Sequence, residues 1–254
     1  MNQPAASALG VVHRRRLRQI WRSAGWPCQD SIEIELLAAG LLERCSPAGV
    51  RESLRLSDSG IQMLAETLRG NRALRDRHES LVARVASQLQ CGGRIAWRGL
   101  SLRAAVADTE RAEGRRWQIA MPDVFSVRNT TVAAYLQSAV HEIKVRRADL
   151  LADLRRADKR AAYLAMAGEC WYVLAEGIAE PDEVPRECGV MLARGPEFST
   201  LEVARAAPVR AMPFEAGLPF AVWMALAVAA PVPRPDDDGQ RWLGQPTDQG
   251  EPPT

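Results

Sequence analysis

Lysine is almost missing from this sequence. Of its 33 strongly basic residues only two are lysines, Lys144 and Lys159, and all the others are arginines. Arginine carries a broad planar guanidinium that stays protonated, whereas lysine carries a compact ammonium whose pKa a protein can tune. A chain that otherwise uses arginine would keep lysine where a compact, tunable charge is required. The two lysines therefore single out residues 121–163 as a candidate functional segment.

Other features that mark common protein classes are also missing. The five cysteines contain no C-x-x-C pair, which argues against a zinc site, and their odd number and wide spacing predict reduced thiols in a cytoplasm. No glycine-rich phosphate loop occurs, so we expect no ATP dependence within this chain. The longest apolar run, residues 218–230, is too short to span a bilayer. The N-terminus does not have the pattern of a signal peptide, because its arginines follow the weakly apolar stretch instead of preceding it. These features predict a soluble cytoplasmic protein without a membrane partner.

Length and charge set broad limits. The chain has 254 residues, enough for one large domain or two small ones, and a net charge of +2. A mildly basic balance permits a nucleic-acid partner without requiring one. The arginines cluster in two places, at "HRRRLR" (residues 13–18) and "RRADLLADLRRADKR" (residues 146–160).

The N-terminal part of the sequence predicts helix, helix, two short strands and helix. The helices are expected at residues 11–25, at residues 29–40 behind Asp30 or Ser31 as N-cap, and from residue 57 onward. A Ser-Pro-Ala-Gly turn at residues 46–49 predicts the hairpin. The apolar stripe expected on the first helix comprises Val12, Leu17, Ile20 and Trp21.

This order of elements, with "LRLSDSGIQML" where a wing passes into a helix, resembles a winged helix-turn-helix domain over about residues 10–72. The helix in the place of a recognition helix carries Glu33 and Glu35, which would repel DNA phosphates. DNA docking by that helix and a packing or dimerisation role are both open at this point.

The sequence changes character from about residue 76. A helix is predicted at residues 76–90, followed by strand-like segments up to residue 145 and an arginine-rich helix at residues 148–167. Three more strand-like segments lie within residues 170–206. This is an α/β order built around a mixed central sheet. The predicted organisation is a winged-helix-like domain at residues 1–72, an α/β domain at residues 76–230 and a disordered, proline-rich tail at residues 231–254.

One constellation in this second region points to chemistry. In "HEIKV" the strand period of two places Glu142 and Lys144 on one face and Ile143 on the other. Upstream, "MPDVF" places Asp123 after an apolar strand, and strand pairing could bring the two carboxylates together. Two carboxylates suit a hard divalent cation, and a lysine beside them would stabilise negative charge developing on a phosphate. Glu-x-Lys alone also arises by chance.

"PD" followed by "EIK" resembles the PD-(D/E)XK nuclease superfamily, which has the restriction-endonuclease-like fold. The resemblance implies a helix, three strands, a second helix and a further strand, in the order seen over residues 76–175. It implies that Asp123 and Glu142 are metal ligands for Mg²⁺ or Mn²⁺ and that Lys144 is the catalytic lysine. It also implies that the backbone carbonyl of Ile143 is an additional ligand.

The resemblance extends to the following helix and to the preceding one. Lys159 and Tyr163 lie four residues apart, hence on one helix face. In several members a Gln-or-Lys-x-x-x-Tyr pair here helps to position the DNA strand or the site carboxylates; packing of Tyr163 on the sheet is the alternative. Glu79 is the candidate for an acidic residue that some members carry on the first helix, and a solvated glutamate is its alternative.

The remaining candidates are basic and aromatic side chains. Four arginines would favour a phosphate backbone, although a solvated helix face with Asp149 and Asp153 is also consistent with the pattern: Arg146, Arg147, Arg155 and Arg156. His141 is expected to pack opposite Glu142, His13 to lie on the surface, and His78 to lack the partners for a metal triad. The tryptophans in strand-like runs are expected in the core: Trp97, Trp117 and Trp171.

The sequence therefore predicts a DNA-associated protein that hydrolyses phosphodiesters with Mg²⁺ or Mn²⁺. By family analogy it would act in DNA repair or in defence against foreign DNA, with a homodimer or a protein partner through the N-terminal domain. The first alternative is a non-catalytic DNA-binding or regulatory protein that uses the nuclease fold as a scaffold. The second is a winged-helix transcription factor with a sensor domain, which the glutamates on the second helix argue against.

Overall fold

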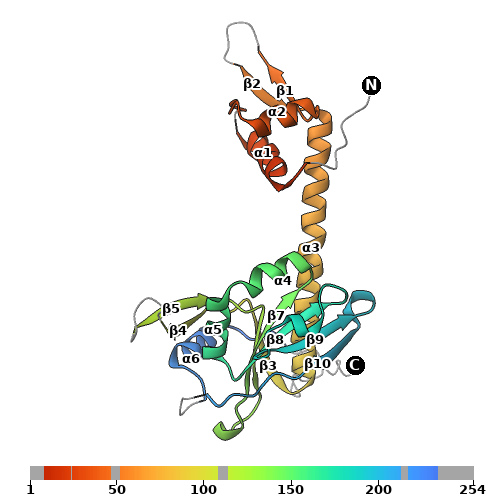
Figure 1. Ribbon diagram of the computed structural model, residues 1–254. Coiled ribbons are helices and arrows are strands. Elements are labelled where there is room, and N and C mark those ends of the chain that lie inside the picture. The colour runs from red at the N-terminus through yellow and green to blue at the C-terminus, as the bar shows by residue number, and fades with distance from the viewer. Residues whose placement is uncertain (1–8, 24, 47–51, 108–113, 213–216, 234–254) are drawn as a thin grey trace, which may run out of the picture. The chain divides into compact units, whose positions relative to one another are not determined.

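A computed structural model describes residues 9–23, 25–46, 52–107, 114–212 and 217–233 of the chain (Figure 1). It consists of two compact units, Met1–Asp76 and Arg77–Thr254, and the long helix α3 (Asp58–Cys91) contributes residues to both. Most of the tail predicted at residues 231–254 lies outside the described residues. None of the helices in the described ranges combines the length and the apolar character that a membrane crossing requires.

The N-terminal unit has the predicted order of helix, helix, hairpin and helix. Asp30 caps the second helix, because its side chain accepts a hydrogen bond from the Glu33 backbone N–H at 3.0 Å. The strands of the hairpin pair antiparallel, from Leu42 opposite Leu56 to Cys45 opposite Ser53. The elements are α1 (Val11–Arg22), α2 (Ser31–Ala38), β1 (Leu42–Cys45), β2 (Ser53–Leu56) and the start of α3.

The apolar stripe predicted on α1 is only partly correct. Leu17 and Ile20 are buried among the leucines of α2, β1, β2 and α3, but Val12 and Trp21 are exposed. His13, expected on the surface, takes the buried position instead. It does so because its Nε2 lies 2.5 Å from the Glu35 carboxylate, which supplies a polar partner for the ring.

Glu33 also differs from its expected role. Its side chain is buried, and its Oε2 accepts the backbone N–H groups of Cys28 and Gln29 at 2.6 and 3.0 Å. The carboxylate is therefore a structural group that holds the loop before α2. Because Glu35 is bound to His13, both glutamates that appeared to oppose phosphate have protein partners.

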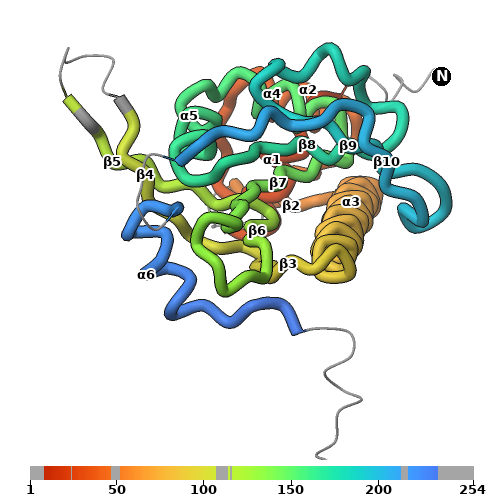
Figure 2. The backbone as a smooth tube through the Cα atoms, turned by 90° about the horizontal axis from the view of Figure 1, so that it is seen from below, coloured from red at the N-terminus to blue at the C-terminus, as the bar shows by residue number. Residues whose placement is uncertain are grey.

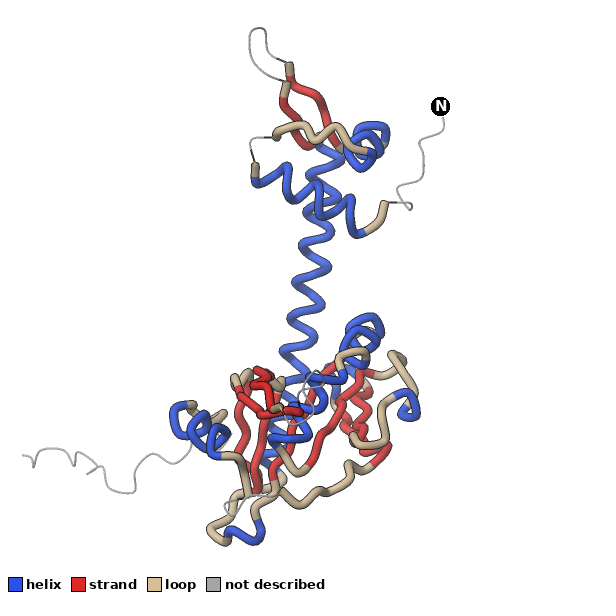
Figure 3. Tube along the Cα trace, turned by 60° about the vertical axis from the view of Figure 1, so that its left-hand side comes forward, coloured by secondary structure: helices blue, strands red, loops and turns tan. Residues whose placement is uncertain are grey.

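The second unit is built on a mixed sheet, as the sequence predicted (Figure 3). The sheet has six strands. Its strand order is β10-β9-β8-β7-β6-β3; the pairs β7–β8 and β8–β9 are parallel and the others antiparallel. The strands are β3 (Arg94–Arg98), β6 (Val124–Arg128), β7 (Ser138–Lys144), β8 (Glu169–Ala175), β9 (Gly189–Arg194) and β10 (Thr200–Arg205). Short 3-10 helices lie at Ala133–Tyr135, Pro181–Glu183 and Pro196–Phe198.

Helices cover both faces of this sheet (Figure 2). On one face, Leu81 and Val85 of α3 pack against Ile143 of β7 and Val173 of β8. On the other face lie α4 (Arg147–Leu154), α5 (Ala157–Met166) and α6 (Phe220–Val228). They pack against the alternate residues of the same strands, including Val140, Tyr172 and Leu174. The strand period of two therefore sorts the central strands into two apolar layers.

Two further strands form a separate antiparallel ribbon, β4 (Leu102–Ala107) with β5 (Arg115–Ala120). Leu102 and Ala104 on its inner face belong to the core that includes α5. Trp117 is 68% exposed on this ribbon, so the prediction that it belongs to the core was wrong. A two-stranded ribbon has only one face against the core, and Trp117 occupies the other. Trp97 and Trp171 are buried, as expected.

The arginine-rich helix predicted at residues 148–167 is divided into α4 and α5 at Arg155 and Arg156. The division has a visible effect on Asp153 and Lys159. Six residues apart on one straight helix they would point to different sides, since each residue turns the helix by a fixed 3.6-residue period. Across the break, Lys159 Nζ lies 2.7 Å from Asp153 Oδ1.

Truncating the core of the central sheet is expected to be costly. Leu174→Ala removes a fully buried side chain of β8 and leaves a cavity, so it should lower the free energy of unfolding by about 2–5 kcal/mol. Leu151→Ala, on the exposed side of α4, is the matched control and should cost about 1 kcal/mol or less. Urea unfolding followed by circular dichroism measures both. Equal losses would contradict the burial of Leu174.

Candidate active site

The only two lysines of the chain meet at one carboxylate. Lys144 Nζ lies 2.5 Å from Glu142 Oε1, and Lys159 Nζ lies 2.6 Å from the same oxygen. Glu142 is 3% exposed, and both ammoniums are largely buried with it. The two positions where this arginine-rich chain keeps lysine are therefore parts of a single cluster.

Three elements position these groups. Glu142 and Lys144 lie two residues apart on β7, so they point to the same face of the sheet, as predicted. Lys159 and Tyr163 project from one face of α5 onto that carboxylate, and the Tyr163 hydroxyl donates to Glu142 Oε2 at 2.7 Å. Tyr163 is also fully buried in the core. Tyr163 therefore packs on the sheet and also contacts the glutamate, so the two alternatives for this residue are compatible.

Asp153 is the member of the cluster that the sequence reading missed. Its Oδ1 accepts from Lys159, its Oδ2 accepts from the Tyr172 hydroxyl at 2.8 Å, and Lys144 Nζ lies 3.7 Å away. The alternative of a solvated face that carries both aspartates does not hold for Asp153, which is buried; Asp149 on the same helix is exposed. A signal was present, since Asp153 follows Leu150 at the three-residue spacing that shares a helix face, and Leu150 packs on the sheet.

Neighbouring charges favour the ionised forms of Asp153 and Lys159. Burial alone would raise the pKa of Asp153, but Lys144 and Lys159 outweigh it and hold that pKa below its usual range. Burial opposes protonation of Lys159, yet Glu142 and Asp153 raise its pKa. Burial and the nearby carboxylates raise the pKa of Tyr163 and of Tyr172 far above the usual value, so both hydroxyls remain protonated donors.

Asp123 lies beside Glu142 through the pairing of β6 with β7. Val124 is opposite His141 in this ladder, so one further step of the antiparallel register sets Asp123 opposite Glu142. The Asp123 carboxylate is anchored there because its Oδ2 accepts the Ile143 backbone N–H at 2.7 Å. The two acidic residues that the sequence paired are thus neighbours. The Ile143 side chain itself lies in the apolar layer against α3.

A cavity of about 320 Å³ opens at Asp123. It is lined from α3 by His78, Glu79 and Val82, and from the end of β3 by Arg98 and Gly99. His78 Nε2 lies 3.5 Å from Asp123 Oδ1, and this contact raises the pKa of His78. Glu79, the candidate acidic residue of the first helix, lies in this cavity wall with its carboxylate 2.7 Å from the Arg98 guanidinium. His78 is a second residue of the site that the spacing argument did not identify.

Asp123 and Glu142 carry the donor type that a divalent cation prefers, and of the two Asp123 lines the cavity of about 320 Å³. Glu142 accepts two hydrogen bonds at Oε1 and one at Oε2, and a carboxylate offers about four acceptor positions. One position therefore remains on Oε2, and Asp123 Oδ1 faces the cavity beside His78. Such oxygens suit Mg²⁺ or Mn²⁺ completed by water. Within the described ranges, no three His, Cys, Asp or Glu side chains form a ready-made metal site.

The predicted phosphate-binding arginines divide into two groups. Arg147 is engaged with protein partners: its guanidinium binds both oxygens of Glu183, at 3.0 and 2.8 Å, and the Ile178 carbonyl. Arg146, Arg155 and Arg156 are exposed at the two ends of α4. These three side chains are oriented to solvent, where a polyanion could reach them.

His141 packs as predicted, on the face opposite Glu142. Its ring is stacked on Trp171, with the ring centroids 6.2 Å apart. Burial, assisted by the charge of Arg94, lowers the pKa of His141 to about 3, and its Nδ1 has no hydrogen-bond partner. His141 is therefore a neutral residue of the core.

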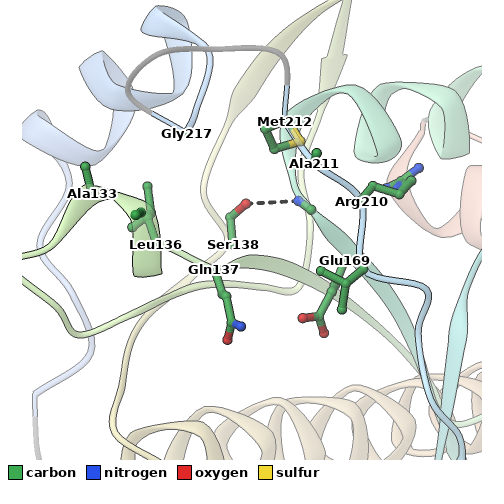
Figure 4. A pocket seen from close by; sticks show the side chains of 12 residues that line it. Ala133, Leu136, Gln137, Ser138, Glu169, Arg210, Ala211, Met212 and Gly217 are labelled. Atoms are coloured by element: carbon green, nitrogen blue, oxygen red, sulfur yellow. Dashed lines mark hydrogen bonds between the residues drawn. The ribbon is translucent and has the colours of Figure 1, made fainter.

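A larger cavity, about 590 Å³, lies at the opposite ends of the central strands, where β7 and β8 begin (Figure 4). Ser138 Oγ accepts the Gly168 N–H at 3.0 Å in its wall, and Glu169 binds the Trp171 indole N–H. None of the residues predicted for the nuclease-like site lines it.

Comparisons with known proteins add a distant likeness only. No protein-family model matches the sequence, and no curated protein matches it significantly. A solved structure of a protein of unknown function from Silicibacter pomeroyi is similar over 57% of this chain and 84% of its own, at 19% sequence identity and a TM-score of 0.37.

Neutralising Asp153 should destabilise the second unit. Asp153→Asn leaves two buried ammoniums with one carboxylate, so the free energy of unfolding should fall by about 3–5 kcal/mol at neutral pH. The difference from wild type should shrink as the pH falls below 3.8, because the low pKa of Asp153 stabilises the fold only while the unfolded carboxyl is ionised. The control is Asp149→Asn on the exposed part of α4. Similar losses for both variants in urea unfolding would argue against the buried cluster.

His141 predicts a pH dependence of stability. In the folded state its pKa is about 3, against 6.5 for the free side chain, so between these values only the unfolded chain takes up a proton. The free energy of unfolding of the wild type should therefore fall by about 2 kcal/mol more than that of His141→Phe between pH 7 and pH 5. Chemical denaturation at the two pH values measures this difference. Parallel pH profiles would show that His141 is not buried as a neutral ring.

Proposed function

We propose that this protein hydrolyses DNA phosphodiester bonds with the help of Mg²⁺ or Mn²⁺, as nucleases of the PD-(D/E)XK type do. The observation that supports this most directly is the convergence of Lys144 and Lys159 on Glu142, next to Asp123, at one end of a mixed sheet. A chain that has 33 strongly basic residues uses its two lysines in this place. Random placement of two lysines in 254 residues would rarely bring both to the same carboxylate.

In this proposal each residue of the cluster has a stated role. Asp123 and Glu142 hold the divalent cation, through the oxygen positions that their protein partners leave free. When bound, such a cation would polarise a phosphoryl oxygen and lower the pKa of a water molecule. Lys144 supplies compact positive charge beside the phosphate, where negative charge grows during attack by water.

Lys159, Tyr163 and Asp153 act as positioning residues. Tyr163 and Lys159 orient the Glu142 carboxylate through separate oxygens. Asp153 is a second acceptor for Lys159, so this ammonium keeps an anionic partner when Glu142 shares its charge with a cation. The attraction between two opposite charges is stronger when both are buried than when they are exposed to water, so the buried pair is held in place.

Binding of DNA would involve exposed basic residues. Arg146 and Arg155 at the ends of α4 are oriented to solvent and suit phosphate contacts. Arg147 contributes less, because Glu183 already binds it. The N-terminal unit, proposed here as a winged-helix-like domain, would add contacts to DNA or to a protein partner, including a second copy. DNA repair and defence against foreign DNA are the natural settings for such an activity.

A second function is favoured by one observation, the hydrogen bonds that Glu142 already accepts from three protein donors. In a non-catalytic DNA-binding or regulatory protein, the same cluster would serve only to hold α4 and α5 on the sheet. The two proposals differ in whether Asp123 and Glu142 bind a cation.

The test is a cleavage assay paired with metal binding. With Mg²⁺ or Mn²⁺, the wild type should cut at least one of three substrates: single-stranded, duplex or branched DNA. Asp123→Asn and Lys144→Met should each reduce the rate at least about 100-fold, since each removes a charge that acts on the transition state. Titration calorimetry with Mn²⁺ should show binding to the wild type and weaker binding to Asp123→Asn.

Asp149→Asn is the control, because it removes an exposed aspartate of the same unit and should retain wild-type rates. A wild type that neither binds Mn²⁺ nor cuts any of the three substrates would rule out the nuclease and leave the scaffold. Full activity in Lys144→Met would exclude the role given to that lysine.

A further inference from the structure

The ribbon of β4 and β5 presents large apolar side chains to solvent. Trp117 is 68% exposed and Ile119 is 55% exposed, and Met121, at the next alternate position, is 57% exposed. The other face of the ribbon is buried, with Leu102 and Ala120 in the core. These three side chains are thus not parts of the packing that holds the ribbon, and contiguous exposed apolar groups mark binding surfaces.

The neighbours of Trp117 leave its ring accessible. Directly across the strand pair it faces Ala105, whose side chain is a single methyl group. Ile119 faces Arg103, and Arg103 is exposed on the same side of the ribbon. An indole beside a small residue, with an arginine diagonal to it, can receive a flat ring on one of its faces.

Arg103 supplies an exposed positive charge on the outer face of the ribbon. The described strands, Leu102–Ala107 and Arg115–Ala120, contain no acidic residue. Arginine interleaved with an aromatic ring matches a chain of phosphates that carries unpaired bases. It does not match a basic partner, and a purely apolar partner would leave Arg103 without a counter-charge.

The ribbon begins and ends at the candidate active site. Gly99, shortly before β4, donates its N–H to the carbonyl of Asp123, shortly after β5, at 3.3 Å. Both residues line the cavity of about 320 Å³. Met121 accepts at its carbonyl from the Tyr163 hydroxyl at 3.1 Å, which ties the same segment to the cluster around Glu142. A DNA strand bound along the outer face of the ribbon would therefore lie on a segment that ends at Asp123.

We propose that the outer face of the β4–β5 ribbon binds single-stranded DNA, with unpaired bases stacked on Trp117 and phosphates at Arg103. The inference rests on the proposed nuclease function and specifies its substrate as DNA that is unpaired next to the cleaved bond. Bases in a duplex are stacked on each other and do not expose the ring faces that Trp117 requires.

The test measures binding without cleavage. Fluorescence anisotropy of a fluorescein-labelled oligothymidine is followed in EDTA with wild type, Trp117→Ala and Tyr135→Ala. Tyr135, an aromatic residue of the same unit that is 59% exposed, is the matched control. Loss of one stacking contact should weaken binding by Trp117→Ala at least about fivefold, whereas Tyr135→Ala should bind as the wild type does. Arg103→Gln should reduce the slope of log affinity against log salt concentration by about 0.7.

Several outcomes would overturn this proposal. Equal affinities of Trp117→Ala and Tyr135→Ala would show that Trp117 takes no part in binding. A blunt duplex of the same length that binds as tightly, and loses as much in Trp117→Ala, would contradict the preference for unpaired bases. Because binding is measured without metal, a wild type that binds the oligonucleotide through Trp117 but cuts nothing would refute the nuclease function and leave the surface intact. Circular dichroism of each variant should match that of the wild type, because the substituted side chains are exposed.

Discussion

The second unit depends on a buried group of four charges, Glu142 and Asp153 with Lys144 and Lys159. Each of these side chains would be expensive to bury alone, and together they supply one another with partners of opposite sign. The group also connects three elements, because its members come from β7, from the end of α4 and from α5. The packing of both helices on the sheet and the orientation of the central glutamate therefore follow from one set of contacts. Tyr163 and Tyr172 complete it by donating to the remaining carboxylate oxygens.

Much of this arrangement could be predicted from local patterns in the sequence. The alternation in residues 138–145 indicated which side chains share a face of the strand, and the four-residue spacing of Lys159 and Tyr163 indicated a shared helix face. Both rules depend only on the regular geometry of one element. The mixed sheet followed from the order of the elements and the length of the apolar runs.

The features that could not be predicted arise between elements. Asp153 joins the cluster because the helix breaks at Arg155 and Arg156, and across this break Lys159 reaches Asp153. Trp117 has the pattern of a core strand, yet its strand pairs with only one neighbour and lies at the margin of the core. His13 is buried because Glu35, from the next helix, meets its ring. In each of these cases contacts between elements, and not the local sequence pattern, determine where the residue lies.

The near absence of lysine has a practical consequence for the chemistry of the surface. The side chains of Lys144 and Lys159 are 10% and 13% exposed, and both amines are engaged in ion pairs. Reagents that acylate or cross-link side-chain amines would therefore find few targets on the folded protein, while reagents that modify guanidinium groups would find many. A partner captured by covalent coupling would have to be attached through carboxylates, arginines or exposed thiols such as those of Cys28 and Cys91. Acylation of either lysine would in turn report that the interior of the second unit had opened.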